Sequence, residues 1–287
     1  MDPVFFTLFV LIMSILAGVL GSLLGIGGGM ILIPFLTLVL HVNIHLAIGA
    51  SIVSVIATSS GAAAAYLKDK ITNVRIGMFL EIGTTTGALA GAILAAYASQ
   101  AVLSLLFGLV LVYSAYQMFR HRHQELPHAV TSSALALKLK MPGTYYDHSL
   151  NQQVDYGVTG VLPGLGVMWM AGALSGLLGI GSGAFKVLAM DLLMKLPMKV
   201  STTTSNLMIG VTAAASAGVY FFRGDINPYL AAPVSIGVLI GSVVGTKLLM
   251  RLRSTRLRQI FVLLLVVLSF SMIWKGAHGL LLGGIHG

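Results

Sequence analysis

The chain has 287 residues, of which 57% are hydrophobic and only 9% are charged. Because a soluble domain carries about 25% charged residues, this composition excludes a soluble protein and predicts an integral membrane protein. Lys and Arg outnumber Asp and Glu by 17 to 8, but most basic residues stand in short loops between apolar runs, a distribution typical of topology signals. The absence of cysteine excludes disulfides, thiolate catalysis and Cys-ligated metal.

Ten apolar segments follow one another, five on either side of a polar stretch. Helices are predicted over residues 4–24, 30–40, 46–67, 76–97 and 101–119, and over 157–178, 184–194, 200–222, 229–250 and 259–274. Eight of them approach the roughly 20 residues that span a bilayer. The segments 30–40 and 184–194 reach only about 17 Å as helix, so they are short crossings or re-entrant arms. The first segment lacks a basic leader, and we expect it to remain as a span.

The two halves are related by an internal repeat, in which adding 154 to a residue number gives its partner. Identical polar or glycine partners include Gly25/Gly179, Gly27/Gly181, Gly29/Gly183, Ser51/Ser205, Thr58/Thr212 and Asn73/Asn227. Such matches at one offset indicate a duplication. Odd numbers of crossings per half place most basic loops in the cytoplasm, which favours inverted repeats. The predicted fold is an all-α polytopic membrane protein with repeats at 1–119 and 157–287 and a polar cytoplasmic linker at 120–156.

Two glycine loops are the first candidate site. The runs Gly25 to Gly29 and Gly179 to Gly183 each follow a long apolar segment and open a short one, the pattern of a discontinuous membrane helix. In a bilayer, an unwound backbone is tolerated only where it is buried in protein or lines a wet cavity. The exposed N–H groups at such a break suit an anion. Candidate binding residues are therefore Gly27, Gly28, Gly29, Gly181, Ser182 and Gly183; the alternative is close packing of helices through small residues.

Polar side chains after the loops are the second candidate layer. Ser51 and Thr58 share one helical face, and Ser205 and Asn206 stand in the corresponding part of the second half. Hydroxyl and amide groups can replace the hydration of an oxyanion, although Ser and Thr in membranes also bond their own helix carbonyls. Lys186 follows the second loop and would add a positive charge; the alternative is that it pairs with Asp191 or snorkels.

Other ionisable residues are predicted to be structural or interfacial rather than proton carriers. Glu81 stands near Arg75 in sequence, and Asp191 precedes Lys195 by four residues, an ion-pair spacing. His121, His123, His128 and Glu125 resemble a metal cluster but follow an Arg-rich helix end, so we interpret them as a solvated segment. The sequence contains no catalytic triad, P-loop or dinucleotide fingerprint. We therefore predict no enzyme activity, no cofactor and no metal site.

The polar linker contains an alternating pattern. Leu135, Leu137, Leu139 and Met141 are separated by polar or small residues, and Pro142-Gly143 is a turn signal. The pattern predicts a small β-hairpin or an ordered loop between the repeats.

The segment from Gly18 to Gly29, with Pro34 five residues on, resembles the opening signature of the TauE/SafE family of sulfite exporters, also called the toluene-sulfonate uptake permease family. The resemblance places the family's glycine motif at Gly25, Gly27, Gly28 and Gly29, with a second copy at Gly179, Gly181 and Gly183. That copy departs from the first, because Ser182, Lys186 and Leu188 replace Gly28, Leu32 and Pro34. The resemblance implies a transporter of sulfite or organosulfonates in a bacterial or archaeal cytoplasmic membrane.

These observations predict a secondary transporter that exports a small oxyanion by alternating access, with one half rocking against the other. A membrane potential that is negative inside supplies about 2.3 kcal/mol per monovalent anion per 100 mV, so it suffices to drive an anion outward. The alternatives are a membrane enzyme that acts on a lipid-linked phosphate and an anion channel.

Overall fold

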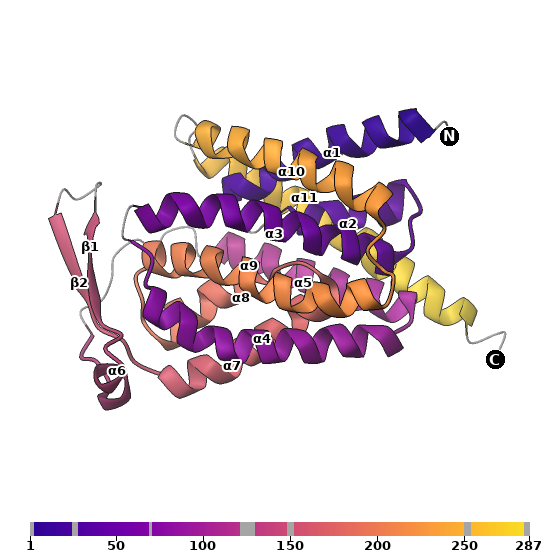
Figure 1. The fold of residues 1–287 in the computed structure, drawn as a ribbon. Helices are drawn as coiled ribbons and strands as arrows, with labels where there is room; N and C mark the ends of the chain where they lie inside the picture. The colour runs from indigo at the N-terminus through magenta and orange to yellow at the C-terminus, as the bar shows by residue number, and fades with distance from the viewer. Residues whose placement is uncertain are drawn as a thin grey trace.

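The computed structural model describes residues 3–24, 28–68, 71–120, 130–147, 152–249 and 254–283. Over these residues the chain forms a bundle of long helices with a small hairpin at one end (Figure 1). The long helices are α1 (Pro3–Leu24), α3 (Ile44–Lys68), α4 (Val74–Tyr97), α5 (Gln100–Arg120), α7 (Val161–Leu178), α9 (Met198–Phe222), α10 (Pro228–Leu249) and α11 (Ser254–Gly283). Their bounds are close to those predicted, except that α11 continues to Gly283.

Two short helices follow the glycine loops. In the first half α2 (Gly29–Pro34) continues into a π-helical turn, η1 (Phe35–Val39), and in the second half α8 (Gly183–Leu188) continues into η2 (Ala189–Leu193). All four bounds differ by the repeat offset of 154. Pro34 does not cause the π-helical turn, because Leu188 occupies the same place before η2. The two predicted short segments are thus present as a pair of equivalent broken helices.

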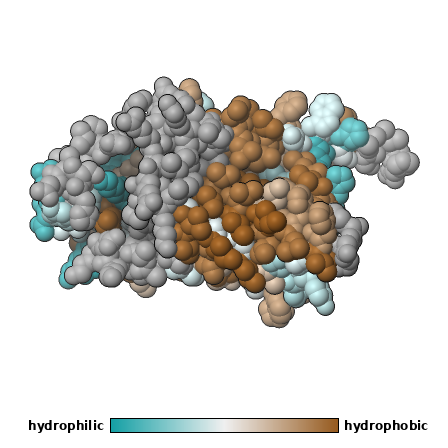
Figure 2. All heavy atoms as spheres, turned by 90° about the horizontal axis from the view of Figure 1, so that it is seen from above, coloured by the Kyte–Doolittle hydropathy of each residue, from teal (hydrophilic) through white to brown (hydrophobic). Residues whose placement is uncertain are grey.

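The outer surface of the bundle is apolar. Among the described residues, seven helices are long and apolar enough to cross a membrane, and Gly29–Val39 and Ile44–Ser60 form shorter apolar helices. Large apolar side chains are exposed around the bundle, among them Phe222 at 90%. Figure 2 shows a broad hydrophobic face over the middle of the molecule. A surface of this extent requires an apolar surrounding, which confirms a multi-pass integral membrane protein.

The two halves of the chain interleave. Helix α1 packs mainly on α10, and the corresponding pair in the other half is α7 on α4. Likewise α3 packs on its own repeat partner α9, and α5 packs on α11. Each long helix therefore has its main neighbour in the opposite half. A rigid rocking of one half against the other, as predicted from the sequence, would separate every one of these pairs.

The duplication extends to single hydrogen bonds and close contacts. After each π-helical turn a backbone N–H reaches six residues back, from Val42 to Leu36 and from Leu196 to Met190, both at 3.0 Å. A Cβ at Gly87 would meet the Trp169 carbonyl of α7, and one at Gly241 would meet the Ile15 carbonyl of α1, which is the equivalent contact. The alternative role of glycine, close helix packing, therefore holds for the glycines of α4 and α10.

The linker contains the hairpin that the sequence predicted, but in different residues. Strands β1 (Gly143–Asp147) and β2 (Gln152–Tyr156) pair antiparallel, with Tyr145 opposite Val154. The alternating segment that suggested a first strand instead forms a short helix, α6 (Ala134–Lys138), because the Ser133 hydroxyl caps it by accepting the Ala136 N–H. Pro142-Gly143 leads into β1, and the turn of the hairpin lies outside the described residues.

Asn73 ties the hairpin to the bundle. Its Nδ2 donates to Met141 O at 2.8 Å and to the Tyr156 hydroxyl at 2.9 Å, while its Oδ1 caps α4 by accepting from Ile76 N. Burial raises the pKa of Tyr156, so this phenol stays neutral at physiological pH. One amide therefore fixes both the start of α4 and the position of the hairpin.

Replacing Asn73 with alanine is expected to lower the stability of the fold by about 1–2 kcal/mol and to loosen the hairpin, because a helix cap and two partly buried hydrogen bonds are lost. Its repeat partner Asn227, whose Oδ1 accepts only from Tyr229 N among the described residues, is the matched control. Limited proteolysis in detergent should show faster cleavage between residues 130 and 156 in Asn73→Ala only. Equal cleavage of the two variants would contradict this role.

Candidate functional site

The second glycine loop is a true break between helices. Gly179, Gly181 and Ser182 have φ of 65, 71 and 46°, all in the left-handed region. Because an L-residue in that region costs about 1–2 kcal/mol, Ser182 is held there by its surroundings. The break confirms the predicted discontinuous helix in the second half. In the first half Gly25, Ile26 and Gly27 lie outside the described residues, and Gly28 has an ordinary helical φ of −67°.

The two loops meet inside the bundle. The Ser51 hydroxyl of α3 donates to the Gly179 carbonyl at 2.8 Å. A Cβ at Gly29 would meet this same hydroxyl and would lie 3.1 Å from Gly179 O. Gly29, Ser51 and Gly179 are thus brought together from both halves of the chain, as expected for two loops that approach one point.

The other predicted hydroxyl and amide groups divide into two sets. Ser205 is buried and donates to Gly183 O at 3.3 Å, so it faces the second loop. Thr58 donates to Ser54 O and Val55 O on its own helix, which is the structural alternative. Asn206 is half-buried beside Ser205 on α9. Ser205 thus lies at the loop, while the Thr58 hydroxyl bonds to carbonyls of α3.

Lys186 lies in a buried charged cluster. It is fully buried, and its Nζ donates to Thr212 Oγ1 on α9 at 2.6 Å. Thr212 Oγ1 in turn lies 2.7 Å from Glu81 Oε1 on α4, which also accepts the Thr85 hydroxyl at 2.9 Å. The Arg75 guanidinium, which is close to Glu81 in sequence, donates to Lys140 O in the linker. Lys186, Thr212, Glu81 and Thr85 are called the charged cluster below.

The charged cluster lies at mid-depth in the bundle. Thr212 is close to the middle of α9, which runs from Met198 to Phe222. An ion at the centre of a membrane is costly unless it is paired and hydrogen-bonded, and here a cation and a carboxylate share one hydroxyl. The cluster also joins the two halves, because Glu81 belongs to the first and Lys186 to the second. It is the one charged contact between the halves that the described residues place near mid-depth.

The region around the second loop is closed. Gly181, Ser182 and Gly183 are all buried. Within the described part of the chain the Ser182 hydroxyl has no hydrogen-bond partner, although it is fully buried. Unsatisfied buried hydroxyls are uncommon and call for an explanation such as a ligand or water. Ser182 precedes Lys186 by four residues. A ligand bound to the Ser182 hydroxyl would therefore lie on the same segment as Lys186.

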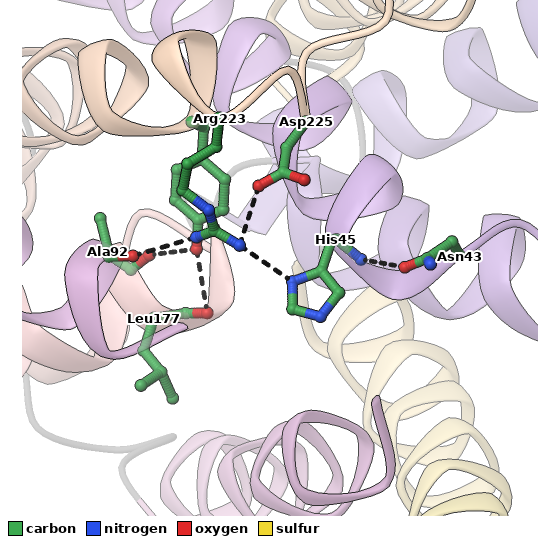
Figure 3. A network of polar contacts seen from close by, with 8 residues as sticks. Asn43, His45, Ala92, Leu177, Arg223 and Asp225 are labelled. Atoms are coloured by element: carbon green, nitrogen blue, oxygen red, sulfur yellow. Dashed lines mark hydrogen bonds and ion pairs between the residues drawn. The ribbon is translucent and has the colours of Figure 1, made fainter. Parts of the chain in front are cut away.

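A second polar network closes one end of the bundle (Figure 3). Arg223, at the end of α9, pairs with Asp225 at 3.0 Å and donates to the Ala92 carbonyl of α4 at 3.2 Å. Its guanidinium also lies 3.5 Å from His45 Nδ1 on α3 and over the Tyr220 ring. Because the guanidinium is occupied by these partners, the network holds α3, α4 and α9 together.

An open cavity of about 1420 Å³ lies at the C-terminal end of α11. Its polar lining comes from η1 and the residues after it, from α5 and from α11, and includes His41, Ser104, Lys275 and His278. The Lys275 ammonium donates to Thr37 O at 2.6 Å. None of the predicted binding residues lines this cavity, so it is separate from the glycine loops.

The histidines at 121, 123 and 128 and Glu125 lie outside the described residues. Among the residues that are described, no group of three or more His, Asp or Glu side chains could hold a metal ion.

Long apolar helices around buried polar contacts define a multi-pass integral membrane protein. The family model described as "Sulfite exporter TauE/SafE" matches residues 10–272. The chain therefore belongs to the TauE/SafE family, which confirms the resemblance seen in the glycine motif.

Curated relatives of the chain are named as transporters. "Probable membrane transporter protein YunE" of Bacillus subtilis is 25% identical over 272 residues, which cover 92% of this chain and 96% of the relative. YjnA of the same organism is 27% identical over 279 residues (92% and 98%). MJ0441 of Methanocaldococcus jannaschii is 24% identical over 282 residues (92% and 94%). No solved structure matches the chain.

Proposed function

We propose that this protein is a secondary transporter that exports a small oxyanion, sulfite or an organosulfonate, by alternating access. The observation that carries the proposal is Lys186, a fully buried lysine at mid-depth that follows a broken helix. Ionisable groups in such a place are rare and serve ion or substrate pathways. An exported oxyanion would supply a negative charge to pair with the buried ammonium.

The binding site in this proposal combines both halves. Lys186 supplies the positive charge, and Ser182 supplies a buried hydroxyl without a partner among the described residues. Ser51 and Ser205 now bond loop carbonyls at 2.8 and 3.3 Å, and they turn toward the anion when it enters. Gly27 to Gly29 and Gly181 to Gly183 let the backbone approach the ligand closely. Asn206 and Thr58 extend the site along α9 and α3.

The transport step in this proposal uses mixed helix pairs as its moving units. Two inverted repeats would place the loops near the midplane from opposite sides. Because α4 packs on α7 and α1 packs on α10, each rigid unit contains helices of both repeats. The buried loop and Lys186 correspond to an occluded state, from which these pairs would open alternately to either side.

The test is anion release from proteoliposomes at clamped membrane potential, with sulfite, methanesulfonate, sulfate and chloride as probes. We expect saturable release of sulfite or methanesulfonate and none of chloride. Flux that rises without saturation would replace the transporter by a channel. No flux of any anion at any potential or pH gradient would overturn oxyanion transport, and a lipid-linked phosphate would then be the next substrate class to test.

A further inference from the structure

Glu81 has no part in binding an anion, yet it is built into the charged cluster. Its Oε1 accepts from the Thr85 hydroxyl and lies against Thr212. Its Oε2 is buried and has no partner in the part of the chain that the structure describes. A carboxylate with one unsolvated oxygen in the membrane is held charged only by a nearby cation. The charge of Glu81 therefore depends on Lys186.

The Thr212 hydroxyl has two hydrogen-bond acceptors within reach but only one proton to donate. It accepts from Lys186 Nζ at 2.6 Å and has two acceptors within reach, Glu81 Oε1 at 2.7 Å and its own helix carbonyl, Met208 O, at 2.8 Å. A hydroxyl donates only one hydrogen bond. It therefore donates to Glu81 when that carboxylate is charged, and to Met208 O when Glu81 is neutral. The same atomic positions serve both protonation states of Glu81.

We propose that Glu81 is a proton-binding site, and that its protonation frees Lys186 so that an anion and a proton are carried together. The inference rests on the proposed oxyanion transport, but it replaces the membrane potential as the driving force, because a proton and a monovalent anion carry no net charge together and follow their own concentration gradients. A proton arriving from water would bind the unpartnered Oε2, which leaves the ammonium of Lys186 without a counter-charge. The anion then replaces the carboxylate as the partner of Lys186. When the anion leaves, Glu81 releases the proton to water and pairs again with Lys186.

Lys186 is the cation that faces Glu81. The other titratable groups on the surrounding elements are Arg75 and Tyr97 on α4, Lys199 and Tyr220 on α9, and Asp191 on η2; α7 carries none. Arg75 is exposed and bonded to Lys140 O, Lys199 is exposed, and Tyr220 donates to Gly176 O. Glu81 is linked to Lys186 through the Thr212 hydroxyl that both contact. Proton and anion therefore exchange at one pair of residues.

The cluster also links binding to opening. Glu81 stands on α4, which packs on α7, whereas Thr212 stands on α9, which packs on α3, so their contact joins two of the helix pairs. With Glu81 charged and no anion present, the contact holds the two sides together. With Glu81 neutral and the anion on Lys186, this attraction is removed. Loading of both proton and anion would therefore favour the opening of the occluded state.

The experiment uses proteoliposomes with a pH-sensitive dye in the lumen and methanesulfonate as the probe, because this strong acid carries no proton itself; sulfate serves as a second strong-acid probe. In the wild type we expect one proton to accompany each methanesulfonate, flux that does not respond to voltage, and a KM that rises with pH. Glu81→Gln mimics the neutral acid. It should carry the anion without protons, with a KM that is independent of pH and with flux that responds to voltage.

Thr212→Val and Thr212→Ser form a second, matched pair that does not depend on Glu81→Gln folding. Loss of the hydroxyl in Thr212→Val should lower the proton-to-anion ratio, and Thr212→Ser should restore it. If wild-type flux is voltage-driven and without protons, or if Glu81→Gln keeps the pH dependence of the wild type, Glu81 is not the proton site while oxyanion transport stands. If the wild type moves no oxyanion of any kind, both proposals fall.

Discussion

Lys186→Met is expected to abolish oxyanion transport and to destabilise the protein by about 3–5 kcal/mol, the range measured when one partner of a buried ion pair is removed. The loss of transport follows because Lys186 is the fully buried cation beside the second loop. The loss of stability follows because the buried Glu81 carboxylate would lose the cation that it reaches through Thr212, while its hydrogen bonds with the Thr212 and Thr85 hydroxyls remain. Flux per folded protein and thermal unfolding in detergent measure the two effects separately.

The double variant Lys186→Met with Glu81→Gln separates charge balance from transport. With the carboxylate removed, no unpaired charge remains, so thermal stability should return close to that of the wild type while transport stays absent. Glu81→Gln alone keeps the lysine and should keep transport. Flux in Lys186→Met equal to that of the wild type would remove the ammonium from the binding site and leave the charged cluster with a structural role only.

Much of the fold could be predicted from the sequence because the repeat constrains it. The offset of 154 that relates Gly29 to Gly183 also relates the bounds of α2 and η1 to those of α8 and η2. The pairing of helices across the halves could not be predicted, because it depends on side-chain packing between segments that are distant in sequence. Likewise the alternation around Leu135 favoured a strand, whereas a local cap at Ser133 decides for a helical turn.

The candidate site was predictable where the signal is local. Lys186 and the glycine loop adjoin each other in sequence, and the left-handed backbone at Gly181 follows from residue type. The contact of Glu81 with Thr212 could not be predicted, because it joins residues that are 131 positions apart. One signal was available: a carboxylate inside a long apolar segment is itself a functional indicator. Only the structure shows that Glu81 is linked to Lys186 of the other repeat through Thr212.

Substitution of Gly181 is expected to have the second largest effect. Gly181 has φ of 71°, and a Cβ there would lie 2.9 Å from Ile209 Cγ2 on α9 and 3.2 Å from Val55 Cγ1 on α3. In Gly181→Leu the side chain would wedge between helices of the two halves, one residue before Ser182. We expect flux to fall below a tenth of the wild-type value, which corresponds to an increase in activation free energy of more than about 1.4 kcal/mol. The variant should remain folded in detergent. Gly27→Leu is the equivalent test of the first loop.

Gly224→Ala is the matched control for backbone strain, with Gly181→Ala as its counterpart. Gly224 has nearly the same φ, 76°, but a Cβ there meets nothing within 4 Å. Both alanines carry the left-handed penalty of about 1–2 kcal/mol, and Gly181→Ala should lower thermal stability further, because its Cβ also meets Ile209. Only Gly181→Ala should also reduce flux, because only there does the new methyl group press on the helices that must separate around the loop. Equal flux in the two alanine variants, together with unchanged flux in Gly27→Leu and Gly181→Leu, would mean that the glycine loops only pack the bundle and that transport follows another path.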